Sequence, residues 1–230
     1  MVSVGIAGLA LAVAAAIVAA FAWASAGEPR AARVRAALVA GSALAAWMAV
    51  TGALAARGIL ADFSSRPPPL MIVIIVGLAL AIGLGLSPVG GKLARGLPFA
   101  ALVGFHAFRL PLELVMHDAA TRGIMPPQMS FTGDNFDIVS GITAILVAIA
   151  AARGPARVLV WAWNILGLTL LMIVIIIAVA SMPALHRFGT DARHLNTWFA
   201  QFPYIWLPSV LAASALFGHV VLTRRLLAVR

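Results

Sequence analysis

Seven long apolar runs divide this chain almost from end to end. They cover about residues 3–26, 36–56, 69–88, 97–117, 137–152, 158–182 and 203–223, and charge, proline or glycine bounds each of them. An α-helix of about 20 apolar residues crosses the hydrocarbon core of a bilayer, which is roughly 30 Å thick. The sequence therefore predicts an all-α fold, a seven-transmembrane-helix bundle that forms one integral membrane domain over residues 1–230.

The composition excludes an ordinary soluble domain. Hydrophobic residues make up 63% of the chain and charged residues 10%, and the mean hydropathy is +1.06. These values lie far outside those of soluble proteins, so the lipid bilayer is the expected partner. Cysteine is absent, which excludes disulfides, thiolate metal ligands and a cysteine nucleophile.

The net charge of +9 is interpreted as a topology signal, and nucleic acid is not expected as a partner. Of the 16 lysine and arginine residues, the seven-span arrangement puts ten on one side of the membrane, five on the other and Arg109 within a span. This bias predicts an N-terminus outside and a C-terminus in the cytoplasm. The loops at about 118–136 and 183–202 then face outward.

The fourth run carries an unusual set of ionisable residues in the stretch HAFRLPLELVMH. At about 100° per residue, His106, Arg109, Glu113 and His117 share one face of a helix. Arg109 and Glu113 are four residues apart, which predicts an ion pair between them. Pro111 lies away from this face and predicts a kink. Ionisable groups within spans usually face the protein's centre or a watery cavity, although such a pair can also serve only to fix helix packing.

The next segment adds polar candidates. Residues 118–136 are punctuated by glycine and proline and predict an ordered outer loop that folds over the bundle. Asp134 or Asn135 is expected to cap the fifth helix. Asp137 either faces Arg109 or His117, or only compensates the helix dipole at the start of that helix. A stripe of small and polar residues follows it and favours close helix packing.

The last two spans contribute further candidates. Trp161 and Trp163 are expected to anchor the sixth helix at the membrane surface, and Asn164 to form a hydrogen bond between helices. In the seventh helix Pro208 predicts a bend. His219 near the inner end of that helix is more typical of a packing residue than of a ligand.

Several cofactors can be weighed from the residues alone. Retinal is excluded, because the last helix has no lysine and Lys92 in a loop is the chain's sole lysine. Haem is disfavoured, because the one plausible axial pair, His106 and His219, is expected to differ in depth by about two helical turns. The sequence leaves a metal site open as an alternative. Some histidines and acids could converge near the outer surface, although they do not show a typical metal-binding spacing. These residues are His117, Glu113, Asp137, His186 and His194.

The stretch FRLPLELVMHDAATRGIMPPQMSFTGDNFDIVSGITA resembles the signature of a family of uncharacterised bacterial multi-pass membrane proteins. That pattern also includes a WN-x-x-G-L element, matched from Trp163 to Leu168, and a late proline and histidine, matched by Pro208 and His219. The resemblance carries no activity. It implies a location in the inner (plasma) membrane of a bacterium. It also implies that one set of residues forms a single site or scaffold, namely Arg109, Glu113, His117, Asn135, Asp137, Asn164 and His219.

The leading hypothesis is an outward-facing polar cavity, formed by the fourth and fifth spans under the 118–136 loop. It would bind a small polar or anionic ligand, with Arg109 as the positive charge, Glu113 tuning it and His117 linked to protons, in a transporter or sensor. Asn135 and Asp137 complete this expected site, with His106, Asn164 and His219 as secondary candidates. The alternatives are a membrane-embedded metal-dependent enzyme and a structural or assembly subunit, and a homo-oligomer stays open.

Overall fold

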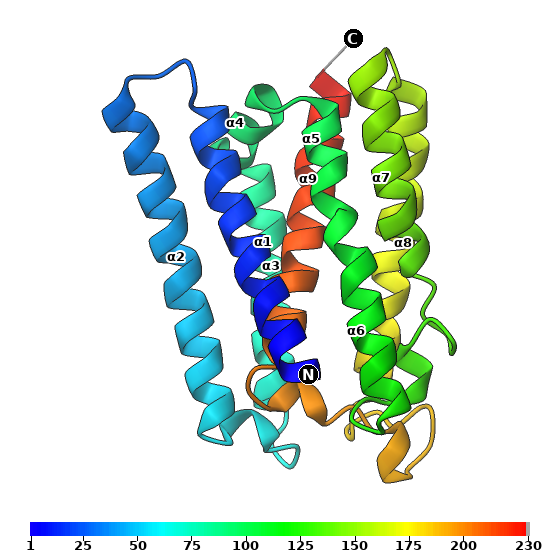
Figure 1. Cartoon of the computed structure of the whole chain (residues 1–230). Helices are drawn as coiled ribbons and strands as arrows, with labels where there is room; N and C mark the ends of the chain where they lie inside the picture. Colours follow the sequence, from blue (N-terminus) through cyan, green and yellow to red (C-terminus); the bar gives the residue numbers. More distant parts are fainter. Residues whose placement is uncertain (229–230) are drawn as a thin grey trace.

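The computed structural model describes residues 1–228, and within this range every regular element is helical (Figure 1). Short 3-10 turns at 59–61, 105–108, 127–129, 192–194 and 198–200 and a π-helical segment, Leu207–Ala212, lie between or next to the longer helices. The α-helices are α1 (Val2–Ala24), α2 (Arg30–Ala56), α3 (Pro69–Leu86), α4 (Pro88–Gly96), α5 (Phe99–Gly104), α6 (Arg109–Thr121), α7 (Ile138–Arg153), α8 (Arg157–Ala180) and α9 (Ala213–Ala228).

Six helical stretches in the described part of the chain are long and apolar enough to cross a membrane, where the sequence predicts seven. They are α1, α2, α3, α8, the composite stretch 99–121, and the stretch 207–228. The seventh predicted span corresponds to α7, an apolar helix of 16 residues. At 1.5 Å per residue α7 is about 24 Å long, shorter than the hydrocarbon core. The described residues therefore form a multi-pass helical membrane protein in which six of the seven predicted spans have the length of a full crossing, and the remaining one, α7, is shorter.

The fourth span is built from three pieces. α5 ends at Gly104, residues 105–108 wind as a 3-10 turn, and α6 begins at Arg109. Pro111 lies in the first turn of α6, so the irregular winding falls next to the proline, which has no amide donor for the preceding turn. The span also runs on to Thr121, one turn beyond its predicted end.

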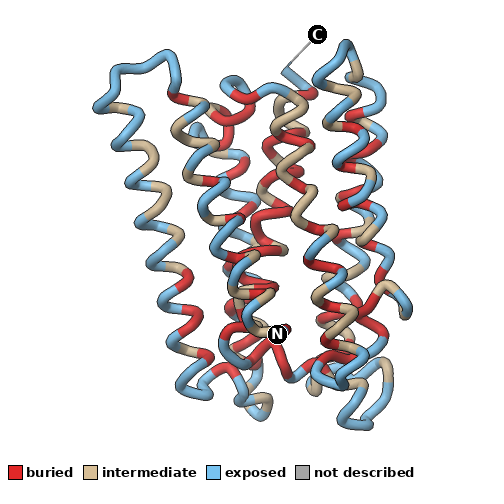
Figure 2. The backbone as a smooth tube through the Cα atoms, viewed as in Figure 1, coloured by how far each residue is buried: buried red, intermediate tan, exposed pale blue. Residues whose placement is uncertain are grey.

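α9 lies at the centre of the bundle, and α2 lies at its rim. More than half of the residues in the apolar stretch of 207–228 are buried, against 17% for α1 and for α2 (Figure 2). α3, α4 and α8 all pack against α9, while α2 packs mainly against α1. The start of α1 and the end of α9 lie at opposite ends of the bundle (Figure 1). Side chains that face α9 are therefore shielded from lipid, and most of the surface of α2 is exposed.

The bend expected at Pro208 takes the form of the π-helical segment that leads into α9. The Ser209 carbonyl in this segment accepts a hydrogen bond from the indole Nε1 of Trp47, at 2.8 Å. Trp206 makes the reciprocal bond, donating its indole Nε1 to the Met48 carbonyl at 3.0 Å. Two indole hydrogen bonds thus connect α2 with the π-helical segment.

The loop between α6 and α7 is ordered and packs against the bundle, as its sequence predicts. Met125 and Met129 are buried. Gln128 donates from Nε2 to Ser181 Oγ at 2.9 Å and to the His194 carbonyl at 2.8 Å. This loop therefore contacts the other long loop, at the end of the bundle where α6 ends and α7 begins (Figure 1).

Candidate functional site

Arg109 is buried at the start of α6 and pairs with Asp137, the residue that precedes α7. Its side chain is 1% exposed. Nε donates to Asp137 Oδ2 at 2.6 Å, and Nη2 donates to Asp137 Oδ1. The expected pair with Glu113 is therefore wrong, and of the two readings of Asp137 the structure shows the one in which it faces Arg109. Gly141 explains the approach of the two helices, because a Cβ there would overlap the backbone of Leu110.

The guanidinium of Arg109 has no N–H left to offer. Besides the two bonds to Asp137, Nη1 and Nη2 each donate to the Gly167 carbonyl at 3.1 Å. Nη1 also lies 3.1 Å from Nε2 of His219. A guanidinium has five N–H donors, and these contacts use all five. The charge of Arg109 is balanced by a carboxylate and its donors are satisfied, so it is not poised to bind an anion.

His219 joins Arg109 to α8. Its Nδ1 lies 2.8 Å from Asn164 Oδ1, and Asn164 Nδ2 donates to Thr223 Oγ1 at 2.8 Å. Since an amide oxygen only accepts, Nδ1 of His219 donates and its Nε2 accepts from Arg109. The hydrogen bond between helices expected at Asn164 is confirmed. Gly167 provides the space, because a Cβ there would lie 2.8 Å from the His219 ring.

His106 packs directly on His219, with ring centroids 4.2 Å apart. Trp163 contacts both rings and is 3% exposed, so the expected surface anchor is instead a core residue. The expected difference of two turns in depth between the histidines is wrong, because the 3-10 turn and the π-helical segment both depart from the ideal helices assumed. The two rings contact each other and leave no room for a porphyrin between them. Neither ring nitrogen of His106 has a hydrogen-bond partner among the described residues.

Glu113 lies one turn after Arg109 and is tied to the loop by Asn135. Asn135 Nδ2 donates to Glu113 Oε2 at 2.8 Å and to the Met129 carbonyl at 3.0 Å, and its Oδ1 accepts from the Asp137 amide at 2.9 Å. Asp137 itself, rather than Asp134 or Asn135, occupies the capping position of α7. Within residues 1–228 Glu113 has no cationic partner in salt-bridge contact and accepts one hydrogen bond, from Asn135.

The remaining candidates lie apart from this group. His117 contacts Ser130 Oγ through Nδ1 at 3.0 Å and stacks on Phe131. His186 is exposed, and its Nδ1 lies 3.1 Å from the Pro183 carbonyl. His194 lies 4.0 Å from Asp191. No group of three or more histidine, aspartate or glutamate side chains that could hold a metal ion occurs in the described part of the chain, so the five candidate metal ligands are not brought together.

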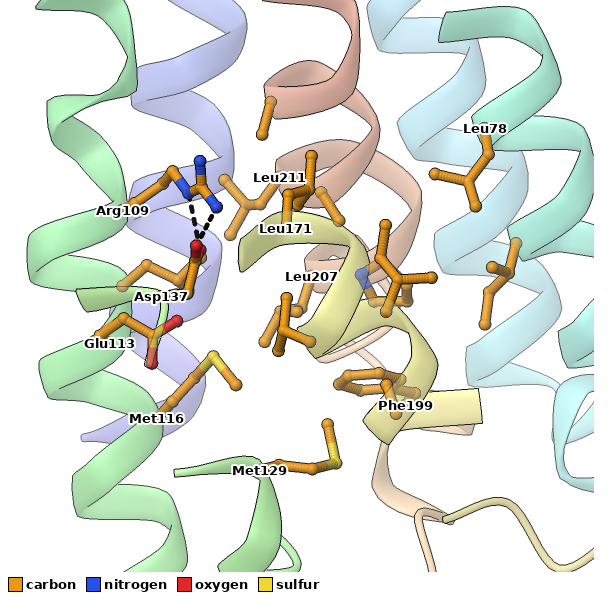
Figure 3. Close-up of a pocket in the computed structure, with 18 of the residues that line it drawn as sticks. Leu78, Arg109, Glu113, Met116, Met129, Asp137, Leu171, Phe199, Leu207 and Leu211 are labelled. Atoms are coloured by element: carbon orange, nitrogen blue, oxygen red, sulfur yellow. Dashed lines mark hydrogen bonds and ion pairs between the residues drawn. The ribbon is translucent and has the colours of Figure 1, made fainter. Parts of the chain in front are cut away.

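A small pocket adjoins the charged residues (Figure 3). It has a volume of about 50 Å³. Arg109, Glu113 and Asp137 lie on one side of it, and side chains such as Leu171, Leu207 and Phe199 face them in Figure 3. The lining comes from α3, α6, α8, the π-helical segment and α9, with Met129 and Phe199 from the two loops. The expected walls, the fourth and fifth spans, are therefore incomplete, and most of the lining is apolar.

The polar group is the hydrogen-bonded cluster around Arg109, Glu113, Asp137, Asn164 and His219. Sequence reasoning missed some of its members. Ser140 donates to Asp137 Oδ1 at 3.1 Å, and the Gly167 carbonyl accepts from Arg109. Ser140 lies three residues after Asp137, a spacing that places both on one helix face, so its contact had a visible signal. A backbone carbonyl has none in the sequence.

Comparison with known proteins gives one family. No curated protein and no solved structure matches this chain. Residues 67–227 match a family described as "Domain of unknown function (DUF8737)", and this range includes Arg109, Glu113, Asp137, Asn164 and His219. The expected membership of an uncharacterised family is confirmed. Since the match extends over more than half of its length, the chain belongs to the DUF8737 family of unknown function.

Proposed function

We propose that this chain is a proton-linked membrane protein, a transporter or sensor, that exchanges a proton at Glu113 and binds a small polar or cationic ligand in the adjoining pocket. It forms one integral domain over residues 1–230 that crosses a bacterial inner membrane seven times. Two observations support the seventh crossing. α7 is apolar and packs against α8, and the start of α1 and the end of α9 lie at opposite ends of the bundle (Figure 1). The lysine and arginine bias favours an N-terminus outside.

The environment of Glu113 carries this proposal. Its side chain lines the pocket, 1% of the residue is exposed, and Asn135 supplies its one hydrogen bond among the described residues. Asp137 takes the charge of Arg109, so Glu113 has no cation of its own. A buried carboxylate without a cationic partner costs free energy, so such a group takes up a proton or a cation instead. The ligand expected here is therefore a proton, a cation or a hydrogen-bond donor, rather than an anion.

The size of the pocket limits what it can hold. A cavity needs about 10–15 Å³ to hold one water molecule, and this one has about 50 Å³. Room for a few waters suits proton exchange and a very small ligand. A drug-sized molecule would need a much larger site.

Infrared difference spectroscopy of the purified protein during a pH titration tests the proposal. We expect a protonated-carboxyl band that titrates in the wild type and is missing from Glu113→Gln. Asp62→Asn removes an exposed acid and serves as the control that keeps the band. In vesicles with an internal pH dye and an imposed membrane potential, a transporter also moves protons in a Glu113-dependent way. A titrating band without flux favours the sensor, and the absence of the band contradicts the proposal.

The saturated contacts of Arg109 favour a second candidate, a structural or assembly subunit. In that case the polar group only fixes the packing of α6, α7, α8 and α9. The same titration separates the two candidates. A structural subunit shows no carboxyl band that depends on Glu113, while Asp137→Asn still destabilises it.

A further inference from the structure

A second hollow lies away from the charged group, between α1, α5 and α9. Its volume is about 350 Å³, and its lining is apolar throughout. Ile17 and Trp23 come from α1, Leu102 and Phe105 from the fourth span, and Val221 from α9. These helices belong to membrane-spanning stretches, so in a bilayer the hollow is a natural place for an acyl chain.

Two arginines lie close in sequence to residues that line one end of this hollow. Val221 lines it, and Arg225 lies one helical turn further along α9. Leu97 also lines it, two residues after Arg95 at the end of α4. Arg225 Nη1 donates to the Arg95 carbonyl at 3.3 Å, which brings the two arginines together. Both lie at the end of the bundle that holds α4 and the end of α9 (Figure 1).

Neither arginine is neutralised. Among the described residues no acidic side chain forms a salt bridge with Arg95 or Arg225, although nearby Lys92 pairs with Glu28 at 2.9 Å. The Nε of Arg225 is buried without a hydrogen-bond partner there. Arg225 also lies over the Phe99 ring, 5.7 Å from its centroid. Arg95 and Arg225 thus carry positive charge without an acidic partner at the end of the bundle where this hollow ends.

We infer that this hollow binds an anionic phospholipid, with an acyl chain along α1, α5 and α9 and the phosphate at Arg95 and Arg225. The complementarity is twofold. The apolar walls match the chain, and the arginines match the phosphate, since guanidinium groups form charge-assisted hydrogen bonds with phosphate oxygens. Basic pockets between membrane helices are typical sites for acidic headgroups. This site is separate from Glu113 and does not depend on the function proposed for that residue.

Native mass spectrometry of the purified full-length chain tests the inference. Phosphatidylglycerol and phosphatidylcholine with the same acyl chains serve as the probes. We expect phosphatidylglycerol to be retained preferentially. The variant Arg95→Gln/Arg225→Gln should lose that preference, with about a fivefold loss of affinity for each arginine removed. The matched control is Arg57→Gln/Arg66→Gln, which removes the same charge from exposed positions at the opposite end of the bundle and should leave the preference intact.

A groove-filling variant makes a second, independent test. Ala101→Trp keeps every charge but fills the apolar hollow, and it should reduce retention of both lipids. Circular dichroism and gel filtration verify that each variant is folded. Equal retention of the two lipids by the wild type overturns the inference, and so does an equal loss of preference in both arginine variants. Undiminished retention by Ala101→Trp overturns the placement of the acyl chain.

Discussion

The guanidinium of Arg109 and the carboxylate of Asp137 meet in a two-pronged ion pair at the crossing of α6 and the start of α7, with side chains 1% and 4% exposed. They are 28 residues apart in sequence. The pair joins the fourth span to α7, and through Gly167 and His219 it also reaches α8 and α9. The hydrogen bonds of this one guanidinium therefore connect four helices.

Asp137→Asn should destabilise the protein strongly. It leaves Arg109 buried without a countercharge, which costs about 3–5 kcal/mol. Thermal unfolding in detergent measures the effect. Asp118→Asn is the control, because its pair with Arg122 is about half exposed and is worth less than about 1 kcal/mol. Equal shifts in the two variants would show that the buried pair is not special.

Glu113→Gln should be nearly neutral for stability. The amide oxygen of glutamine still accepts from Asn135, and Arg109 keeps Asp137, so we expect a change below about 1 kcal/mol. A direct pair between Arg109 and Glu113 would instead make this variant cost on the order of 3 kcal/mol. Unfolding curves of Glu113→Gln and Asp137→Asn recorded side by side distinguish the two pairings.

Gly141→Ala should weaken the crossing of α6 and α7. The added methyl group would overlap the backbone of Leu110, so the helices must separate, at a cost of about 1–3 kcal/mol. Gly83→Ala in α3 is the control, since a Cβ there meets nothing within 4 Å. Thermal unfolding in detergent gives the midpoint of each variant, and we expect the larger decrease for Gly141→Ala. A larger loss in Gly83→Ala would argue against the packing described for Gly141.

His106 and His219 should respond differently to replacement by leucine. His219→Leu removes the acceptor of Arg109 and the partner of Asn164, which costs about 1–3 kcal/mol for the polar groups left buried. His106→Leu removes two ring nitrogens that have no partner among the described residues, so stability should be unchanged or higher. Chemical denaturation measures both variants. A comparable loss in His106→Leu would reveal a polar partner for His106.

The carboxyl group of Asp62, in the loop between α2 and α3, should stay ionised at low pH. Hydrogen bonds from Ser64 and Ser65 lower the pKa of Asp62 from 3.8 to about 2. Because the pKa is lowered on folding, the contribution of these bonds is complete above pH 4 and disappears as the pH falls through about 2. Carboxyl carbon NMR measures the midpoint directly. Ser64→Ala/Ser65→Ala should raise it toward 3.8, and an unchanged midpoint would exclude the serines as its cause.

The membrane-spanning helices were predictable because each needs only a long apolar run, a local property of the sequence. Most side chains of the polar group could be predicted, but their pairing could not. Arg109 and Glu113 are neighbours on one helix, so local spacing favours them, whereas Asp137 reaches Arg109 only because Gly141 lets two backbones approach. Such a contact depends on tertiary packing, which one sequence does not reveal.

The depth of a side chain in the membrane is the other property that sequence spacing could not predict. Ideal helix geometry predicts different depths for His106 and His219, and a position near a helix end favours the membrane surface for Trp163. The 3-10 turn before Arg109 and the π-helical segment before Ala213 change the rise along both helices and bring the two histidine rings into contact. Sequence signals for these irregular turns are limited to Pro111 and Pro208.

The π-helical segment connects the pocket beside Glu113 with two tryptophan side chains. Leu207 and Leu211 form part of the wall of the pocket beside Glu113, and the same segment exchanges indole hydrogen bonds with α2 through Trp47 and Trp206. Any displacement of that wall alters the surroundings of two tryptophan rings. A ligand that displaces this wall should therefore change the intrinsic tryptophan fluorescence of the protein.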